Sequence, residues 1–442
     1  MSSNSGIAMR FPSFMGVPSA AAGRSRRLTS RLTHTVRRRL GLLILVGAIA
    51  IVVAGARPHL QAWYHLRAAR AELQRYHNPQ AIRHLRICRD TWPRDPDVSL
   101  LAARAARRAQ VYGDADRLLR IYREARGRDE THTFEQLLLA TECQVDQTAD
   151  LCWSRMETKD ADAPLLLEAL TRGYLRQYRL GQARRCLERW RQLQPENPQI
   201  FYLEGVAQLD YLHAMSTAAS CFRRAVELDP DHEEARLGLA VALLDGKSFA
   251  RAAEQLQHLR QCQPDNLRIQ VGLAECLEGQ GQNTEAVELT DDVLARQPGY
   301  APALALRGQL ALKDGQWVEA ENWLRQALRG DPTDHRARYG LLRCLEQSGQ
   351  DEELRRERHQ LQQMEDDLAR FNEIVTQEIP QRPTDPALHC TLGQLLLRGG
   401  KRQEGLRWLQ SALRIDPKYA PARQALTNYL SQANAKSQSD SP

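Results

Sequence analysis

Aromatic residues are scarce in this sequence, and long runs of the β-branched residues that build large sheets are missing. Phe, Trp and Tyr together account for 6% of the 442 residues. Leu, Ala, Arg, Gln and Glu dominate instead, which is a composition typical of helices. With 42% hydrophobic and 26% charged residues, the chain can bury a core and is not disordered as a whole. The composition therefore predicts an all-α protein.

Acidic residues are absent from positions 1–71, which contain eleven Arg. Removing these from the 61 Lys and Arg leaves 50 basic against 54 acidic residues over 72–442, a net charge of −4. The overall charge of +7 therefore comes from the N-terminal segment alone. Because the remaining chain has no excess of positive charge with which to attract phosphates, we expect no nucleic-acid partner.

Only one long apolar run is present, LGLLILVGAIAIVVAGA at residues 40–56. Its 17 residues are at the lower limit for a helix that crosses a hydrocarbon core about 30 Å thick. We predict a single transmembrane helix here, preceded by a basic, disordered cytoplasmic tail at 1–39. Seven Arg lie close before the run and three close after it. This asymmetry predicts a cytoplasmic N-terminus and an extracytoplasmic repeat region, which would be periplasmic in a bacterium.

Two targeting segments remain as alternatives to the membrane anchor. The sequence Ala54-Gly55-Ala56 resembles a signal-peptidase site, although the 39 residues before the apolar run are unusually long for a signal peptide. Residues 10–39 are rich in Arg and Ser and lack acids, which also resembles a mitochondrial transit peptide.

Cysteine pairs are missing as well, since the nine cysteines include no Cys-x-x-Cys motif. Cys152, Cys186 and Cys221 follow one another at intervals of 34 and 35 residues, so we interpret them as small core residues at equivalent positions. Free buried thiols are most common in reducing compartments, which weighs against the extracytoplasmic location without excluding it.

The prolines, in contrast, are periodic. Pro230, Pro264, Pro298 and Pro332 stand 34 residues apart, and Pro383 and Pro417 repeat the interval. Extending the series backwards gives ten landmarks, and eight of the ten residues that lie twelve positions before them are Ala. These residues are Ala81, Ala115, Ala149, Ala183, Ala218, Ala252, Ala286, Ala320, Phe371 and Gly405. A period of 34 with a small residue at a fixed place indicates stacked helical hairpins.

These features resemble tetratricopeptide repeats (TPRs), and the resemblance extends over about 62–434. The resemblance is strongest in two units, 301–334 and 386–419. Their matching residues are Gly308, Gly315, Trp317, Ala320, Leu324, Ala327 and Pro332 in the first, and Leu392, Gly393, Gly400, Leu409, Ala412 and Pro417 in the second. The resemblance implies a right-handed α-solenoid of about ten helix-turn-helix units whose first helices, the A helices, line a concave face. It also implies an interaction protein.

The repeats are predicted to span 62–419, followed by a capping helix at 420–434 and a disordered tail at 435–442. Pro332 and Pro383 are 51 residues apart, so one unit carries 17 extra residues. Within 351–379 the apolar residues Leu354, Leu361, Met364, Leu368, Phe371 and Val375 are spaced by three, four or seven positions. This predicts either an elongated helix that packs on its own neighbours or a self-association site.

Catalytic and metal-binding motifs are missing. Gly246-Lys247-Ser248 resembles the end of a phosphate-binding loop, but Val241 stands where the first Gly is required. His84 and Cys88 lie one helical turn apart without further ligands nearby. We therefore predict no catalytic, cofactor-binding or metal-binding residues, and no enzyme.

The sequence thus favours a membrane-anchored scaffold that binds a peptide segment or protein in its concave groove during assembly of an envelope complex. The alternative is a non-catalytic subunit that regulates a membrane enzyme or delivers its substrates. A carboxylate clamp for chaperone C-termini, known in this family, is disfavoured because its Lys and Asn pattern is missing.

The charged A-helix residues predicted to face the groove change sign along the chain. In units one to four they are Arg70, Arg104, Arg107, Arg108, Arg172 and Arg176 against Asp97, Glu142 and Glu168. In units five to eight they are Asp210, Glu234, Asp245, Glu275 and Glu278 against Arg268 and Lys313. They are either solvated helix faces or a polarised groove that takes acidic segments in its first half and basic segments in its middle.

Overall fold

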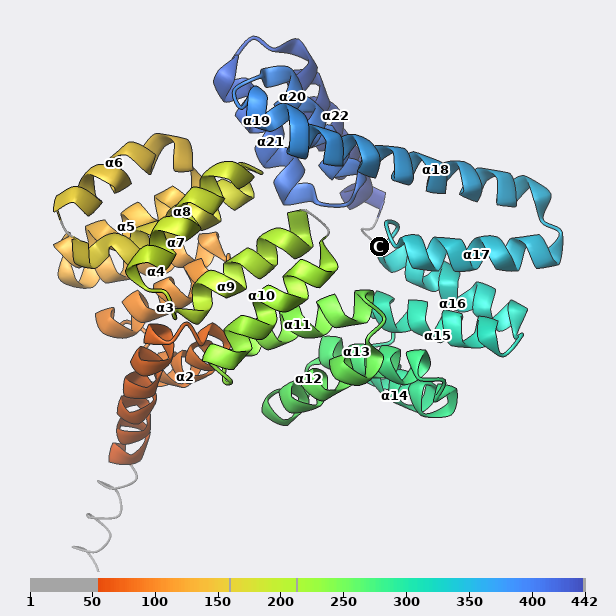
Figure 1. Cartoon of the computed structure of the whole chain (residues 1–442), viewed down its shortest axis with the longest axis horizontal. Coiled ribbons are helices and arrows are strands. Elements are labelled where there is room, and N and C mark those ends of the chain that lie inside the picture. Colours follow the sequence, from red (N-terminus) through yellow and green to blue (C-terminus); the bar gives the residue numbers. More distant parts are fainter. Residues whose placement is uncertain (1–54, 159, 212–213, 440–442) are drawn as a thin grey trace, which may run out of the picture.

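The protein is helical throughout the part of the chain that its computed structural model describes, residues 55–158, 160–211 and 214–439 (Figure 1). No strand occurs among these residues. The predictions of an all-α protein and of a solenoid of helical hairpins are therefore confirmed.

The predicted tail at 1–39 lies outside the described residues, as does the predicted transmembrane helix at 40–56 except for its last two positions. Among the helices that the structure does describe, none combines the length and the hydropathy that a membrane crossing requires.

The helices pair into successive hairpins, beginning with a helix at 55–74 and α2 (Asn78–Thr91). The next elements are α3 (Pro96–Arg108), α4 (Tyr112–Arg126), α5 (Glu130–Cys143), α6 (Val145–Thr158), the short 3₁₀ turn η1 (Asp160–Asp162), α7 (Ala163–Arg176) and α8 (Leu180–Leu193). The middle of the chain contains α9 (Pro198–Val206), the π-helical turn η2 (Ala207–Tyr211), α10 (Met215–Leu228), α11 (Glu233–Asp245), α12 (Phe249–Cys262), α13 (Leu267–Gly279) and α14 (Asn283–Arg296). The remaining elements are α15 (Ala301–Lys313), α16 (Trp317–Gly330), α17 (His335–Ser348), α18 (Asp351–Glu373), the π-helical turn η3 (Ile374–Glu378), α19 (Ile379–Gln381), α20 (Pro386–Arg398), α21 (Arg402–Ile415) and α22 (Ala420–Ser439).

Five of the periodic prolines are followed, two residues later, by an Asp or Asn side chain that caps the next helix. Asp334, two residues after Pro332, accepts a hydrogen bond from the backbone N–H of Ala337 at 2.9 Å. The same role falls to Asp95, Asn197, Asn266 and Asp385. A short polar side chain at this position satisfies one of the free N–H groups at the start of a helix. The proline period therefore fixes where each A helix begins.

A second polar contact repeats six residues after the proline. Arg338 donates to the carbonyl oxygen of Pro332 at 2.8 Å, which ties the first turns of α17 to the preceding loop. Arg236, Gln270 and His389 make the equivalent contact to Pro230, Pro264 and Pro383. These inward-pointing polar side chains satisfy loop carbonyls that the next unit covers.

Close helix approach depends on the small residues found in the repeat. A Cβ atom on Gly308 would lie 2.6 Å from Leu324 Cγ in the paired helix, and one on Gly393 would lie 2.8 Å from Leu409 Cγ. Ala320 and Ala327 are fully buried beside Leu324. The small residues thus let the two helices of a hairpin meet without a gap.

In eight of the hairpins, the turn between the two helices contains a left-handed residue. Gly281, Gly315, Gly349 and Gly400 fill this position in the later units. Tyr76, Gln110, Tyr178 and Lys247 fill it in the earlier ones, with φ between 54° and 64°. A side chain at such a backbone conformation costs free energy. The two tyrosines at this position both make contacts beyond their own hairpin.

The first hairpin packs against the fifth and sixth hairpins across a turn of the superhelix. His77 lies 2.6 Å from Asp229, and Arg83 pairs with Glu233 at 2.8 Å. The ring of Tyr76 lies 6.1 Å from that of Trp190. Contacts over about 150 residues thus join units that are not neighbours in sequence.

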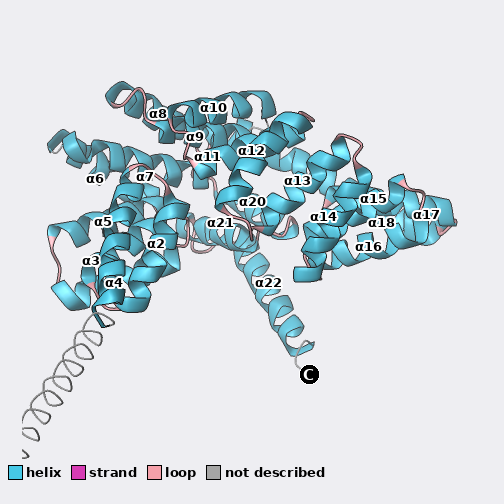
Figure 2. Ribbon diagram, turned by 90° about the horizontal axis from the view of Figure 1, so that it is seen from below, coloured by secondary structure: helices cyan, strands magenta, loops and turns pink. Residues whose placement is uncertain are grey.

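The last complete hairpin also returns to the first half of the chain. Figures 1 and 2 show the chain curving round so that α20 and α21 come back beside it. There Tyr178 stacks on Trp408 with ring centroids 5.6 Å apart, meets the edge of Phe371 at 5.2 Å, and donates to Glu404 at 2.9 Å. We call these four residues the Tyr178 clasp.

The extra residues predicted in unit nine form the long α18, whose 23 residues span about 35 Å and carry the chain to the clasp. Leu354 and Leu361 of its apolar series are buried against α17 and its neighbours, and Val375 is buried at the clasp. Leu368, 44% exposed, is the large apolar residue left at the surface. This favours the elongated helix over the self-association site.

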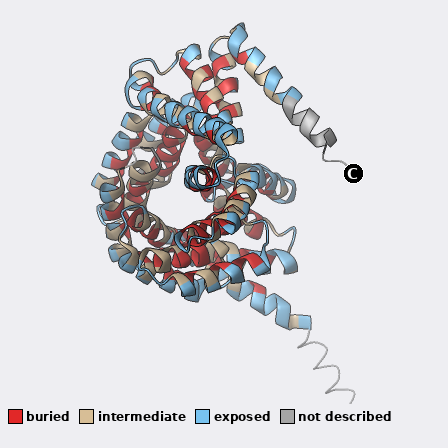
Figure 3. Cartoon of the chain, turned by 90° about the vertical axis from the view of Figure 1, so that its right-hand side faces the viewer, coloured by how far each residue is buried: buried red, intermediate tan, exposed pale blue. Residues whose placement is uncertain are grey.

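The terminal helix α22 runs to Ser439, so it extends beyond the predicted cap at 420–434 and into the tail that we expected to be disordered. Its Ala422 is buried against the last hairpin. Figure 3 shows buried residues lying mainly toward the inside of the ring of helices and exposed ones toward its outer side.

We predict that Gly308→Ala destabilises the protein, because the added Cβ would overlap Leu324. Overpacking of this kind costs about 1–3 kcal/mol, which exceeds the gain of about 1 kcal/mol in helix propensity. Thermal or urea unfolding followed by circular dichroism measures the change. Gly299→Ala is the control, since nothing lies within 4 Å of its Cβ position, and this variant should be neutral or slightly stabilising. Equal effects of the two variants would contradict the packing explanation.

We also predict that Tyr178→Gly releases the last hairpin. Glycine suits the left-handed turn, so the hairpin of α7 and α8 should stay folded while the contacts to Trp408 and Glu404 are lost. The expected results are a larger radius of gyration in X-ray scattering and faster proteolysis around residues 382–385. Gln110→Gly, at the equivalent turn but outside the clasp, should leave both unchanged. A compact, protease-resistant Tyr178→Gly variant would show that the clasp is dispensable.

Candidate functional site

Ion pairs fill the concave side of the first half of the solenoid. Arg107 pairs with Glu142, Arg108 pairs with Glu168 at 2.9 Å, and Arg172 reaches the same Glu168 at 3.3 Å. All five side chains are at most 5% exposed. We call these five residues the buried ion cluster.

The arginines of the buried ion cluster shift the pKa values of its two glutamates. Burial opposes ionisation of Glu168, but the neighbouring Arg108 and Arg172 outweigh it and hold the pKa of Glu168 below its ordinary value. For Glu142, burial outweighs the pull of Arg107, so that its pKa is raised. Breaking such a cluster leaves an unpaired charge in a low-dielectric interior.

The prediction that Arg107, Arg108 and Arg172 line an open groove is therefore wrong, and these side chains are not solvated either. The first helices α3, α5 and α7 approach so closely that their inward charges meet each other instead of a partner. Reversing the charge of Arg107 or Arg172 would disrupt the fold, so it is unsuitable as a test of binding.

The other basic residues predicted for this half lie in three different settings. Arg104 is half-buried and its Nε donates to Glu135 at 2.6 Å. Arg176 is half-buried with its guanidinium 4.1 Å from the centre of the Tyr112 ring. Arg70 is exposed and pairs with Asp97 at 2.9 Å. Of the six predicted arginines, Arg70 alone keeps an exposed side chain.

The acidic residues predicted for the middle units do not form one continuous surface. Glu234 accepts a hydrogen bond from Asn78 at 3.1 Å in the contact between the first and sixth hairpins, and burial raises its pKa to about 7. Asp245 is exposed at the end of α11, and Asp210 lies in the π-helical turn η2. Glu275 and Glu278 sit together on α13.

Both glutamates of α13 are paired with basic residues of later units. Glu278 pairs with Lys313 of α15, and Glu275 lies 3.8 Å from Arg336 of α17. Burial raises the pKa of Glu275, and the charge of Arg336 opposes this increase. The middle of the groove is therefore not the free acidic surface that we predicted.

An open pocket of about 410 Å³ lies beside these pairs. Only the first helices of three consecutive hairpins, α13, α15 and α17, contribute to it. Its lining residues are Glu278, Gln309, Leu312, Lys313, His335, Arg336, Tyr339, Gly340 and Arg343. We call this surface the α17 groove.

Tyr339 and the two arginines on either side of it dominate the α17 groove. Tyr339 is 63% exposed, which is unusual for an aromatic side chain in a protein with so few. Arg343, one helical turn further on, lies 5.9 Å from the Trp317 ring, and no carboxylate in the described part of the chain pairs with it. Arg336 is 68% exposed and only loosely paired. The groove thus offers an aromatic ring and two accessible guanidinium groups.

Arg336, Tyr339 and Arg343 were not among the residues predicted from the sequence, although the repeat indicates the positions of the two arginines. Glu275, Gln309 and Arg343 follow one another at 34-residue intervals, and so do Arg268, Pro302 and Arg336. The predicted groove residues extended only to unit eight, because the 17 extra residues obscured the repeat in unit nine.

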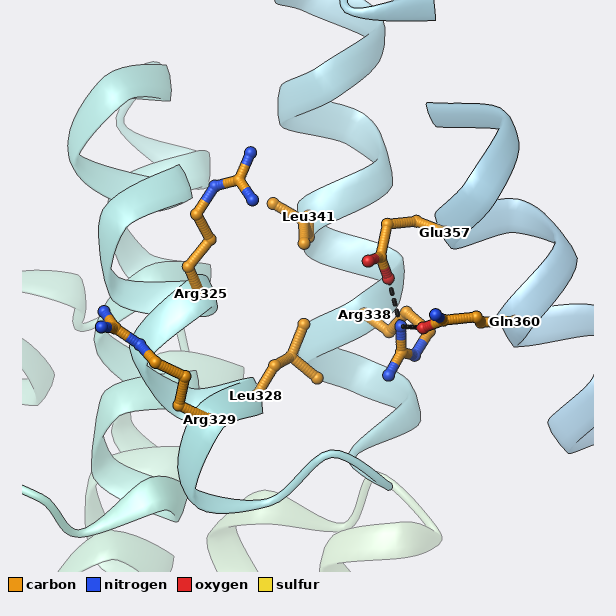
Figure 4. Close-up of a pocket in the computed structure, with 7 residues that line it drawn as sticks. All are labelled: Arg325, Leu328, Arg329, Arg338, Leu341, Glu357 and Gln360. Carbon is orange, nitrogen blue, oxygen red and sulfur yellow. Dashed lines mark hydrogen bonds and ion pairs between the residues drawn. The ribbon is translucent and has the colours of Figure 1, made fainter. Parts of the chain in front are cut away.

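A second pocket, of about 460 Å³, lies between α16, α17 and α18 (Figure 4). Arg338 spans it, pairing with Glu357 and donating to Gln360 at 2.6 Å. Arg325 is bound by Glu321 and Glu353. Since these side chains attach α18 to its neighbours, the pocket is primarily a structural contact.

The α17 groove has features that are suited to binding a partner. In the described part of the chain, no group of three or more His, Cys, Asp or Glu is placed to hold a metal ion. An exposed aromatic ring beside accessible guanidinium groups is an arrangement common at the centres of protein interfaces.

Comparisons with known proteins support the repeats. Residues 216–266 match one tetratricopeptide-repeat family model, and residues 247–310 and 311–353 match another. The TPR resemblance is therefore confirmed over 216–353. Proteins with such repeats generally mediate protein–protein interactions, and the fold is typically non-catalytic.

One curated relative is the human antiviral innate immune response effector IFIT1, which is 24% identical over 216 residues. The match covers 45% of this chain and 44% of IFIT1, so the chain spans less than half the length of that relative.

Similar solved structures include human IFIT1 as a dimer with PPP-AAAA, at a TM-score of 0.39 and 15% identity over 73% of this chain and 90% of that one. MamA from Desulfovibrio magneticus RS-1 has a TM-score of 0.35 and 19% identity over 39% of this chain and 97% of MamA.

We predict that Glu168→Gln strongly destabilises the first half of the solenoid, because Arg108 and Arg172 would lose their shared carboxylate in a buried site. Removing one partner of a buried pair typically costs about 3–5 kcal/mol. Urea unfolding followed by circular dichroism should show an earlier first transition. Glu188→Gln, in the exposed pair with Arg184, is the matched control and should change stability by less than about 0.5 kcal/mol. Similar shifts for both variants would argue against a stabilising buried ion cluster.

Proposed function

We propose that the protein is a scaffold that binds an extended segment of a partner protein in the α17 groove. The observation that carries this proposal is the exposed Tyr339 between Arg336 and Arg343, on the concave side of consecutive TPR units. Most other charged residues predicted for the concave side are already paired within the chain.

The partner segment should carry acidic side chains and an apolar or aromatic one. The carboxylates would pair with Arg343 and Arg336, and the apolar side chain would pack on Tyr339 beside Leu312. This reverses our expectation that the middle units receive basic segments, because Glu275 and Glu278 are neutralised by Arg336 and Lys313. An acidic segment of the partner would compete with Glu275 for Arg336 and replace their loose pairing at 3.8 Å by a closer one.

The proposed scaffold is non-catalytic and anchored to a membrane through residues 40–56, with the N-terminus in the cytoplasm and the repeats outside it. The apolar run and the arginine asymmetry of the sequence support this arrangement. Assembly of an envelope complex is the proposed role, because a tethered groove would keep its partner near the membrane.

We predict that Arg343→Glu combined with Tyr339→Ala abolishes partner capture. Reversing a charge that the partner would cover, and removing an aromatic anchor, each typically cost about 2 kcal/mol or more of binding free energy. This corresponds to at least a tenfold loss of affinity. The measurement is crosslinking in native membranes with the full chain, followed by mass spectrometry and by affinity measurement with the captured partner.

The control is Arg329→Glu, which reverses an exposed arginine on α16 outside the α17 groove and should leave capture unchanged. Undiminished capture by the Arg343 and Tyr339 variant would refute the groove assignment. A stoichiometric membrane enzyme among the crosslinks would point to the regulatory-subunit alternative, and a nucleic acid would contradict a protein partner.

A further inference from the structure

The helix at 55–74 has two opposite faces. On one face Ala62, Ala69 and Leu73 are buried, and Ala69 and Leu73 pack in the core formed with α2 and α3. On the other face Leu60, Trp63 and Tyr64 are exposed, at 67%, 58% and 64% respectively. The exposed face is therefore strongly apolar, although the helix already buries the other one.

The spacing of these three residues makes them a single patch. Residues at positions i, i+3 and i+4 are neighbours on a helix surface, so Leu60, Trp63 and Tyr64 lie together. Arg57 and Arg67 occupy the same face before and after them and are also exposed. Scattered exposed apolar residues are ordinary, but a contiguous patch of this kind marks an interaction surface. We call it the Trp63 patch.

We infer that the Trp63 patch lies in the interface of the membrane, an inference that rests on the proposed anchor at 40–56. A helix of 17 residues is about 25 Å long, roughly 5 Å short of the hydrocarbon core. The run ends at Ala56, and Leu60 follows about 6 Å further along. Leu60 would therefore complete the apolar length, and Trp63 and Tyr64 would lie among the headgroups.

The chemistry of the patch fits this environment. Trp and Tyr combine an apolar ring with a polar group and concentrate at membrane interfaces. Arg57 and Arg67 can extend their guanidinium groups to lipid phosphates while their stems stay near the apolar region. A protein partner would not require the patch to begin directly where the apolar run ends.

This placement determines how the solenoid sits on the membrane. The helix at 55–74 extends from the body at the end occupied by α2, whereas α15 to α17 lie on the far side of the molecule (Figure 1). With its first hairpin held at the headgroups, the protein would present the α17 groove away from the bilayer, toward partners in the aqueous compartment.

The test is quenching of tryptophan fluorescence by brominated lipid, with the full chain reconstituted into mixed phosphatidylcholine–phosphatidylglycerol vesicles. We expect the wild-type protein to lose part of its emission when brominated phosphatidylcholine replaces the ordinary lipid. Trp63→Phe should abolish this loss. Trp153→Phe, which removes a tryptophan that is 39% exposed on α6, is the matched control and should leave it intact.

Flotation of the same vesicles tests the proposed membrane anchor independently of the Trp63 patch. If the chain floats with the vesicles but Trp63→Phe leaves the quenching unchanged, the interfacial position of the Trp63 patch is refuted and the anchor is retained. A chain that does not float refutes both. Photocrosslinking from position 64 to a second copy or to another protein, instead of to lipid, would also overturn the inference.

Discussion

No hairpin in this chain can bury its apolar face alone, and the rest of the structure depends on this constraint. Each unit presents a stripe of Leu and Ala that its own two helices cover in part and the next unit completes, as Leu324 is covered by Gly308 of its own unit and Gly340 of the next. The stacking distance must therefore be nearly the same at every junction. Small residues at the crossing points, capping side chains after most of the periodic prolines and side chains that bind proline carbonyls all maintain this distance.

Curvature decides what happens to the side chains that point inward. In the first half, the units turn tightly enough for α2 to reach the fifth hairpin, and inward charges are pressed together as the buried ion cluster. Buried ion pairs contribute little net stability, but once formed they oppose any opening that would separate them. The first half is consequently a closed, rigid platform, whereas the hairpins that contain α13 to α17 keep an accessible concave surface.

The hairpins and their boundaries could be predicted from the sequence because they follow from local rules, namely the proline interval, the small residue before it and helix propensity. The accessibility of the groove could not. Arg107 and Arg343 are both arginines on first helices, but Arg107 is 1% exposed and Arg343 is open to solvent. The difference arises from how far consecutive units rotate, a sum of small angles that no single residue encodes.

The Tyr178 clasp is another feature that local rules did not predict, and it explains the departure from regular spacing. A regular unit nine would carry the last hairpin onward along the superhelix, whereas the long α18 returns it to Tyr178. Tyrosine at a left-handed turn position costs free energy that a glycine would avoid, and the contacts of Tyr178 with Trp408 and Glu404 offset this cost. The strained turn and the extra residues thus serve the same end, which is to close the solenoid on itself.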